Sequence, residues 1–169
     1  MELRRFFEHA IRASFSDLAV RDEPAATYLA DLLTRFARTE SLYPAGRSMP
    51  RLETVVDMLL DAQAVWQPES PHFEPQGEIA IRRHIGDYTL FMLGIFRERV
   101  ERVASTSYFI VRGKQAYRFV SEHARARAST SAPPYGRLAD HFEHYAGALD
   151  YARRVHFFGH PAHPFFSLG

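Results

Sequence analysis

The N-terminal part of the chain alternates apolar and polar positions with the spacing of amphipathic helices. In residues 3–18 apolar side chains recur every three or four positions, which predicts a first helix with a broad apolar stripe. Asp22, just before Pro24, is the expected N-cap of a second helix, because a carboxylate there can accept hydrogen bonds from the first helix amides. The stripe positions are Leu3, Phe6, Phe7, Ala10, Ile11 and Leu18, followed by Tyr28, Leu29, Leu32, Leu33, Phe36 and Ala37.

Turn-forming residues interrupt this pattern in the middle of the chain. The segment Thr39–Ser48 contains Pro44 and Gly46 and is expected to be a loop. A third helix is predicted to open at Ser48 and Pro50 and to run toward Trp66. The Pro-rich segment Gln67–Gly77 is expected to be an irregular crossing.

Helical spacing returns in the second half of the chain. A fourth, very apolar helix is predicted over Glu78 to about Arg102, and a fifth from the Ser105-Thr106-Ser107 cluster to about Arg127. After a loop over Ala128–Gly136, a sixth helix is expected from Arg137 to about His156. No domain boundary is visible, so residues 1–169 are predicted to form one all-α domain, a bundle of about six helices.

Composition narrows the function classes. The chain has no Cys, which excludes disulfides, thiolate metal sites and a cysteine nucleophile. It carries 20 Arg but only one Lys, and its net charge of +1 gives no reason to expect binding to nucleic acid or to an anionic membrane. The Arg excess is typical of a GC-rich bacterial genome. Without an uninterrupted apolar stretch long enough for a signal peptide or a membrane span, a cytoplasmic location is expected.

The segment Arg83-His84-Ile85-Gly86-Asp87-Tyr88-Thr89-Leu90-Phe91 is unusual for an amphipathic helix. Gly86 costs about 1 kcal/mol relative to Ala in a helix interior, and a carboxylate follows it in a run of buried character. In a structural interpretation, Gly86 and Gly94 let another helix approach. Asp87 then pairs with Arg83 one turn earlier, or accepts a hydrogen bond from a Tyr of a facing helix.

The order of residues from Arg83 to Tyr117 resembles a family of uncharacterised bacterial all-helical proteins. Its core pattern is Arg-x-x-Gly-Asp-x-x-Leu-Phe-x-x-Gly-x-Phe, followed here by Tyr108 and by Gly113 with Tyr117 four residues on. The family's Phe-Pro-Glu stands here as Phe96-Arg97-Glu98, so the proline expected to break the helix is missing. The resemblance implies a helical fold and supplies no activity.

The same segment also suggests a polar ligand site inside the bundle. The helical spacing of His84, Asp87 and Tyr88 places them on one face, and residues of the next helix can oppose them. The candidate ligand-binding residues are Arg83, His84, Asp87, Tyr88, Tyr108 and Tyr117. A His and a carboxylate one turn apart can act as a proton-transfer pair, so an enzyme using His84 and Asp87 is a weaker alternative. No nucleophile or oxyanion motif accompanies them, and neither catalytic residues nor a cofactor are predicted.

Some of the histidines have a spacing that could suit metal ligands. Asp140, His141 and His144 have helical spacing, but the paired Glu-x-x-His motifs of a di-iron bundle are absent, since Glu69 to His72 is the only such spacing. A solvated polar helix face is therefore predicted, and no metal site.

The irregular tail 156–169 is rich in Phe, His and Pro. Because exposed Phe side chains are costly, the tail is expected to pack on its own bundle, or else on a second subunit or protein partner. The leading hypothesis for the whole chain is a non-enzymatic structural or protein-interaction module. A bundle that binds a small apolar or aromatic ligand or cofactor near Asp87 is the alternative.

Overall fold

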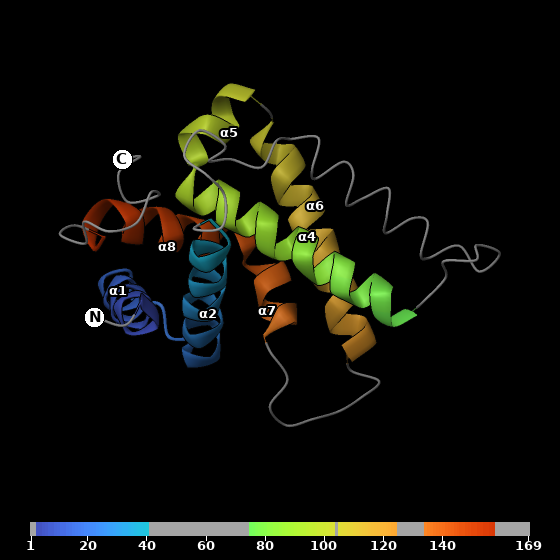
Figure 1. Cartoon of the computed structure of the whole chain (residues 1–169), viewed down its shortest axis with the longest axis horizontal. Helices are drawn as coiled ribbons and strands as arrows, with labels where there is room; N and C mark the ends of the chain where they lie inside the picture. The colour runs from blue at the N-terminus through green and yellow to red at the C-terminus, as the bar shows by residue number, and fades with distance from the viewer. Residues whose placement is uncertain (1–2, 41–74, 104, 125–133, 158–169) are drawn as a thin grey trace.

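A computed structural model describes residues 3–40, 75–103, 105–124 and 134–157 of the chain. Every regular element in these ranges is a helix and none is a strand, which confirms the all-α prediction (Figure 1). The helices are α1 (Leu3–Asp17), α2 (Glu23–Glu40), α4 (Pro75–Ile95), α5 (Arg97–Val103), α6 (Thr106–Ala124), α7 (Tyr135–Asp140) and α8 (Phe142–Val155). The third helix predicted near Trp66 and residues 158–169 of the tail lie outside the described residues.

Helix α4 is the centre of the fold. All of its residues from Ile85 onward are buried, as is Phe96 after it, and a helix that is buried on every side is an internal one. It crosses the middle of the view in Figure 1, with α6 packed along it and α8 and α2 also in contact. Helix α1 packs against α2 and α8, and α7 packs against α6. The central segment of the sequence is thus the core of the bundle.

The expected helix over 78–102 differs from the structure at its start and in its middle. It begins earlier, at Pro75, since a proline is tolerated in the first turn, where helix amides lack partners. It is also divided at Phe96, between α4 and α5, although no proline stands there. The division is accompanied by edge-on packing of the Phe96 ring against Phe91, with ring centroids 5.6 Å apart.

The expected continuous helix from Arg137 to His156 is also divided, at His141. The φ and ψ of His141 are −119° and 31°, and its amide donates to the Arg137 carbonyl oxygen at 2.9 Å, which closes α7. Helix α8 then begins with Phe142, whose side chain is completely buried against Gly113 of α6. The packing of this ring on α6 accompanies the change of direction.

Two predicted helix starts are confirmed by their capping bonds. Asp22 Oδ1 accepts a hydrogen bond from the Ala25 amide at 3.1 Å at the start of α2. Ser105 Oγ accepts a longer one, 3.4 Å, from the Tyr108 amide at the start of α6. Both caps satisfy helix amides that have no partner within their own helix.

The start of the C-terminal tail packs on its own chain. Phe157 is 5% exposed, and its ring lies 5.6 Å from Phe7 and 5.8 Å from Phe6 of α1. Next to it, His156 Nε2 is 2.9 Å from Asp17 Oδ2, which also accepts a hydrogen bond from Tyr151 at 2.8 Å. These first tail residues therefore extend the core of the bundle.

None of the helices in the described ranges is both long and apolar enough to cross a membrane.

Candidate functional site

Asp87 lies at the meeting point of α2, α4 and α6. Its side chain is 1% exposed. Its Oδ1 accepts hydrogen bonds from the hydroxyl of Tyr28 on α2 at 2.6 Å and from the hydroxyl of Tyr117 on α6 at 2.7 Å. Its Oδ2 accepts one from Nη2 of Arg35 on α2 at 3.1 Å. We refer to these four residues as the Asp87 cluster.

The donors of the cluster offset the cost of burying a carboxylate, which is several kcal/mol for an unpaired ion. Burial raises the pKa of Tyr28 and Tyr117 above its ordinary value, and the neighbouring Asp87 carboxylate raises it further. Burial alone would lower the pKa of Arg35, but Asp87 outweighs it and the pKa is raised. The tyrosines therefore remain protonated donors and Arg35 remains a cation. The Asp87 carboxylate is thus paired with one cation and two hydroxyl donors.

The close approach of α4 and α6 depends on Gly86. A Cβ atom on Gly86 would stand 2.6 Å from Cε1 of the Tyr117 ring, which is too close for any side chain. Gly94, two turns on, allows a similar approach to Leu149 of α8, where the corresponding distance is 2.5 Å. Both glycines thus have the packing role that the sequence predicts for them.

The cation beside Asp87 is not the one predicted from helical spacing. In the described part of the chain Asp87 is paired with Arg35 of α2, whereas Arg83 is exposed on α4. The predicted Arg83–Asp87 pair is therefore replaced by a contact between helices. The carboxylate faces the buried hydroxyls of Tyr28 and Tyr117, while Arg83 stays at the solvent side.

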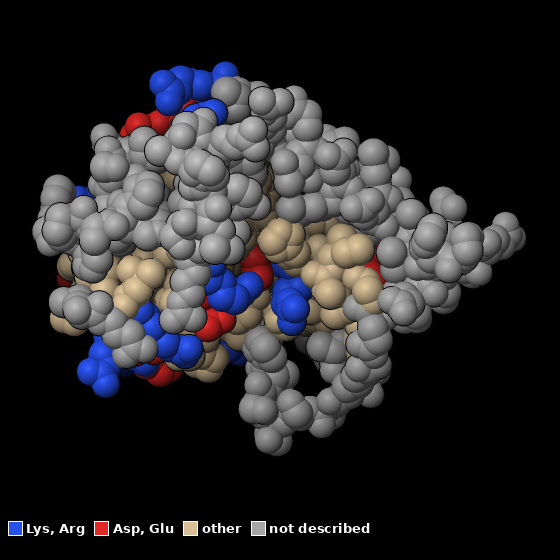
Figure 2. Space-filling view, in the orientation of Figure 1, with Lys and Arg blue, Asp and Glu red and all other residues tan. Residues whose placement is uncertain are grey.

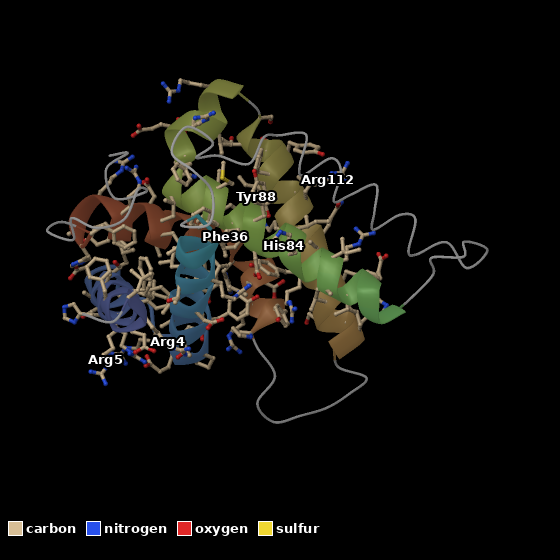
Figure 3. The ribbon with its side chains drawn as sticks, viewed as in Figure 1. Arg4, Arg5, Phe36, His84, Tyr88 and Arg112 are labelled. Atoms are coloured by element: carbon tan, nitrogen blue, oxygen red, sulfur yellow. The ribbon has the colours of Figure 1, made fainter. Side chains whose placement is uncertain are left out.

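His84 is exposed and stacks on an aromatic pair. The centroid of its ring is 6.1 Å from that of Phe36, and the two rings are nearly parallel (Figure 3). Phe36 stacks in turn on Phe91, with ring centroids 4.5 Å apart. Partial burial lowers the pKa of His84, and Arg35 lowers it further, whereas Asp87 opposes both. Among the hydrogen bonds of the described residues, none joins His84 to Asp87. The proton-transfer pair considered from the sequence is therefore not assembled in this structure.

The remaining candidate tyrosines lie away from the Asp87 carboxylate. Tyr88 is 2% exposed in the core, and burial raises its pKa. Tyr108 is half-buried, with Arg112 above its ring at 5.3 Å. It stands nine residues before Tyr117 on α6, about 13 Å along the helix axis. Of the six candidates, the structure joins Asp87 and Tyr117 directly.

Sequence reasoning missed Tyr28 and Arg35 as members of the site. The sequence places Tyr28 in an apolar stripe, within the segment Tyr28-Leu29-x-x-Leu-Leu that matches the resembling family loosely, and its spacing gives no role to Arg35. The two residues are about two turns apart on α2 and share its face. A tyrosine hydroxyl in a stripe whose other side chains carry no polar group, with an arginine two turns on, is the available indication that this face meets a buried acid.

The structure shows no metal centre among the described residues, where no group of three or more His, Asp or Glu side chains lies close enough to hold an ion. Asp140 pairs instead with Arg118 at 3.2 Å, and the rings of His141 and His144 are 5.9 Å apart. Glu69, His72 and the tail histidines His160 and His163 lie outside the described residues.

The fold and the site define an all-α bundle protein with a buried Tyr–Asp–Tyr–Arg cluster at its centre. No family model, curated protein or solved structure matches the chain. The resemblance carried by the residues from Arg83 to Tyr117 remains a prediction. Function is therefore inferred from the contacts of this chain alone.

Proposed function

We propose that the protein is a non-enzymatic helical module in which the Asp87 cluster holds the bundle together, and that its surface makes the contacts with other molecules. The observation that carries this proposal is the bonding of Asp87. Both of its carboxylate oxygens are already bonded, to donors that come from α2 and α6. The charge is used inside the protein to connect helices that are distant in the sequence.

A structural role explains this geometry better than an interior ligand site does. A ligand that bound the Asp87 carboxylate would have to displace the hydroxyl of Tyr28 or Tyr117, or the guanidinium of Arg35. A hydrogen bond to a charged group contributes about 1.5–3 kcal/mol, so the ligand would have to supply a bond at least as strong as the one it displaces. The close contact of Gly86 with the Tyr117 ring leaves no space between the helices at this point.

Charge and composition support the finer parts of the proposal. On the face shown in Figure 2, Arg and Asp or Glu side chains of the described residues lie next to one another, without a patch of one sign. This arrangement supports a module that does not bind nucleic acid. We also propose a bacterial, cytoplasmic protein, in keeping with its Arg-rich, Cys-free composition. A homodimer or protein partner bound through tail 156–169 remains part of the proposal.

The substitution Asp87→Asn tests the proposal. It removes the buried charge that accepts three hydrogen bonds and should lower the free energy of unfolding by about 3 kcal/mol, which for a chain of this length corresponds to roughly 6–12 °C in Tm. Asp31→Asn is the matched control, because Asp31 also pairs with Arg35 but has a side chain that is 42% exposed. An exposed pair contributes about 0–1 kcal/mol, so the control should change Tm little.

Native mass spectrometry of the purified protein provides the second measurement. The proposal predicts masses equal to the chain or its multiples, without a small molecule whose binding depends on Asp87. A small molecule that is present in the wild type and absent from Asp87→Asn, at unchanged Tm, would show that the cluster is a ligand site.

A further inference from the structure

A pocket lies at the corner where α1 meets α2, away from the Asp87 cluster. Its volume is about 440 Å³, within the range of sites for small molecules. Phe15, Val20 and Ala26 provide apolar lining, and Ser16 and Arg21 are among its polar lining residues. The pocket therefore combines apolar surface with hydrogen-bond donors.

Each charged side chain that lines this pocket has an oppositely charged partner, except that of Arg21. Arg12, which also lines the pocket, has its Nε 2.8 Å from Glu23 Oε1. Asp22 is paired with Arg137 of α7 at 2.7 Å. Arg21 is exposed, and no ion pair or hydrogen bond joins its guanidinium to another described residue. The pocket thus keeps one guanidinium that is not neutralised.

One residue of the pocket wall, Asp22, is held by three partners. Asp22 accepts hydrogen bonds from the Tyr145 hydroxyl at 2.8 Å and from the Ala25 amide, in addition to its pair with Arg137. The preceding turn contains Ala19 in the left-handed region, with φ of 55°. This conformation is the usual end of a helix, because the Val20 and Ala19 amides donate to the Phe15 and Ser16 carbonyl oxygens at 2.8 and 3.2 Å and close α1. The turn and the bonds of Asp22 hold this part of the pocket wall in place.

We propose that this pocket binds a small molecule with one carboxylate on an apolar body, such as an aryl or short alkyl acid. The guanidinium of Arg21 matches a carboxylate in shape and charge, since its N–H groups can donate two parallel hydrogen bonds. The apolar body would cover Phe15, Val20 and Ala26. Because the other charges that line the pocket are paired, Arg21 can neutralise one negative charge of a ligand but not the second charge of a phosphate. This site is independent of the structural role of Asp87.

Titration of the full-length protein with 4-phenylbutyrate, followed by two-dimensional NMR of the backbone amides, tests the assignment. Saturable shifts confined to the amides around 15–26 are expected. Phenyl phosphate, which has a similar body and a second negative charge, should bind more weakly. The absence of saturable shifts, or their appearance mainly elsewhere, would overturn the proposed site, and tighter binding of phenyl phosphate would overturn the carboxylate assignment.

Two substitutions connect the binding to the pocket. Arg21→Gln removes the unneutralised charge and should weaken binding of 4-phenylbutyrate about tenfold, whereas Arg102→Gln on α5 should leave it unchanged. Ser16→Trp places a large side chain on the pocket from an exposed position and should abolish binding while the helical circular dichroism is retained. Binding by Arg21→Gln with wild-type affinity would overturn the proposal whatever the behaviour of the Trp variant.

Discussion

Gly86 of α4 lies directly against the aromatic ring of Tyr117 of α6, where a Cβ atom on Gly86 would stand 2.6 Å from Cε1 of the ring. Tyr117 has no room to move aside, because it is completely buried and its hydroxyl is bonded to Asp87, the neighbour of Gly86. The separation of the two helices and the hydrogen bond to Asp87 are therefore coupled. The glycine permits the short distance that the tyrosine needs to reach the carboxylate.

The substitution Gly86→Ala should destabilise the protein. The added methyl group overpacks the contact with Tyr117, and overpacking a core typically costs about 1–3 kcal/mol. Gly147→Ala on α8 is the matched control, because a Cβ atom there meets no other atom within 4 Å. Alanine is the better helix former and should stabilise α8 by about 0.5–1 kcal/mol. Urea denaturation measures both changes, and a neutral Gly86→Ala would contradict the close approach.

Tyr28 and Tyr117 should show a strong energetic coupling through Asp87. Each Tyr→Phe substitution removes one hydrogen bond to a charged oxygen and should lower the free energy of unfolding by about 1.5–3 kcal/mol. The double variant should lose more than the sum, because it leaves Oδ1 of Asp87 without the two hydroxyl donors. Couplings of about 0.5–3 kcal/mol are typical of such networks.

A double-mutant cycle measured by urea denaturation gives this coupling. Tyr151→Phe serves as the control, since its hydroxyl also bonds to a carboxylate, Asp17, but in an exposed setting where little change is expected. Additive effects of the Tyr28 and Tyr117 substitutions would contradict a shared acceptor.

The Asp22 carboxylate should make stability depend on acid pH. Burial acts to raise its pKa, but hydrogen bonds from Arg137, Tyr145 and the Ala25 amide outweigh burial and hold the pKa below the ordinary value of 3.8. A group whose pKa is lower in the folded state stabilises the fold above its unfolded-state pKa, and this contribution is lost as the pH falls through the folded-state pKa.

The difference in unfolding free energy between wild type and Asp22→Asn isolates this contribution, because the amide does not titrate. The difference should be largest near pH 6 and should shrink as the pH is lowered from about 5 toward 2. Urea denaturation across this range measures it. A difference that stays constant with pH would show that the lowered pKa has no energetic consequence.

Phe157 should contribute to the stability of the single chain. Its ring is buried against Phe6 and Phe7, so Phe157→Ala should lower the free energy of unfolding by about 2–3 kcal/mol. Val155→Ala, at a position that is 43% exposed, should change it by less than about 0.5 kcal/mol. Calorimetry and size-exclusion chromatography are measured together. A changed elution volume at unchanged Tm would indicate that Phe157 packs on another subunit.

The two helix divisions illustrate what sequence patterns leave out. At His141 neither proline nor glycine marks a break, and at Phe96 the nearest one is Gly94, which is a buried packing position inside α4; apolar residues continue at helical spacing on both sides of each break. The chain turns where the Phe96 ring packs on Phe91 and where Phe142 packs on Gly113. The contact of Phe142 with Gly113 joins α8 to α6, and the contact of Phe96 with Phe91 forms only once the chain has turned after α4, so a helical periodicity does not predict either of them.

In the Asp87 cluster, too, the sequence pattern predicts some of the contacts and not others. The pattern around Gly86 and Asp87 predicts a close helix approach and a tyrosine donor from a facing helix, and Tyr117 confirms both. The other donors, Tyr28 and Arg35, are 59 and 52 residues away from Asp87 in the sequence. Spacing identifies the face of a helix on which a residue lies, but it does not identify the helix that this face meets.

The sequence by itself determined the helical class, the capping residues Asp22 and Ser105, and the central place of the segment around Asp87. These properties depend on local periodicity and on contacts of a few residues, which a single chain segment carries. Only the tertiary structure decided that the partner of Asp87 is Arg35 rather than Arg83, and that a pocket with an unneutralised arginine forms between α1 and α2. Both depend on how separate helices pack, and that packing is set by the shapes of buried side chains from distant parts of the chain.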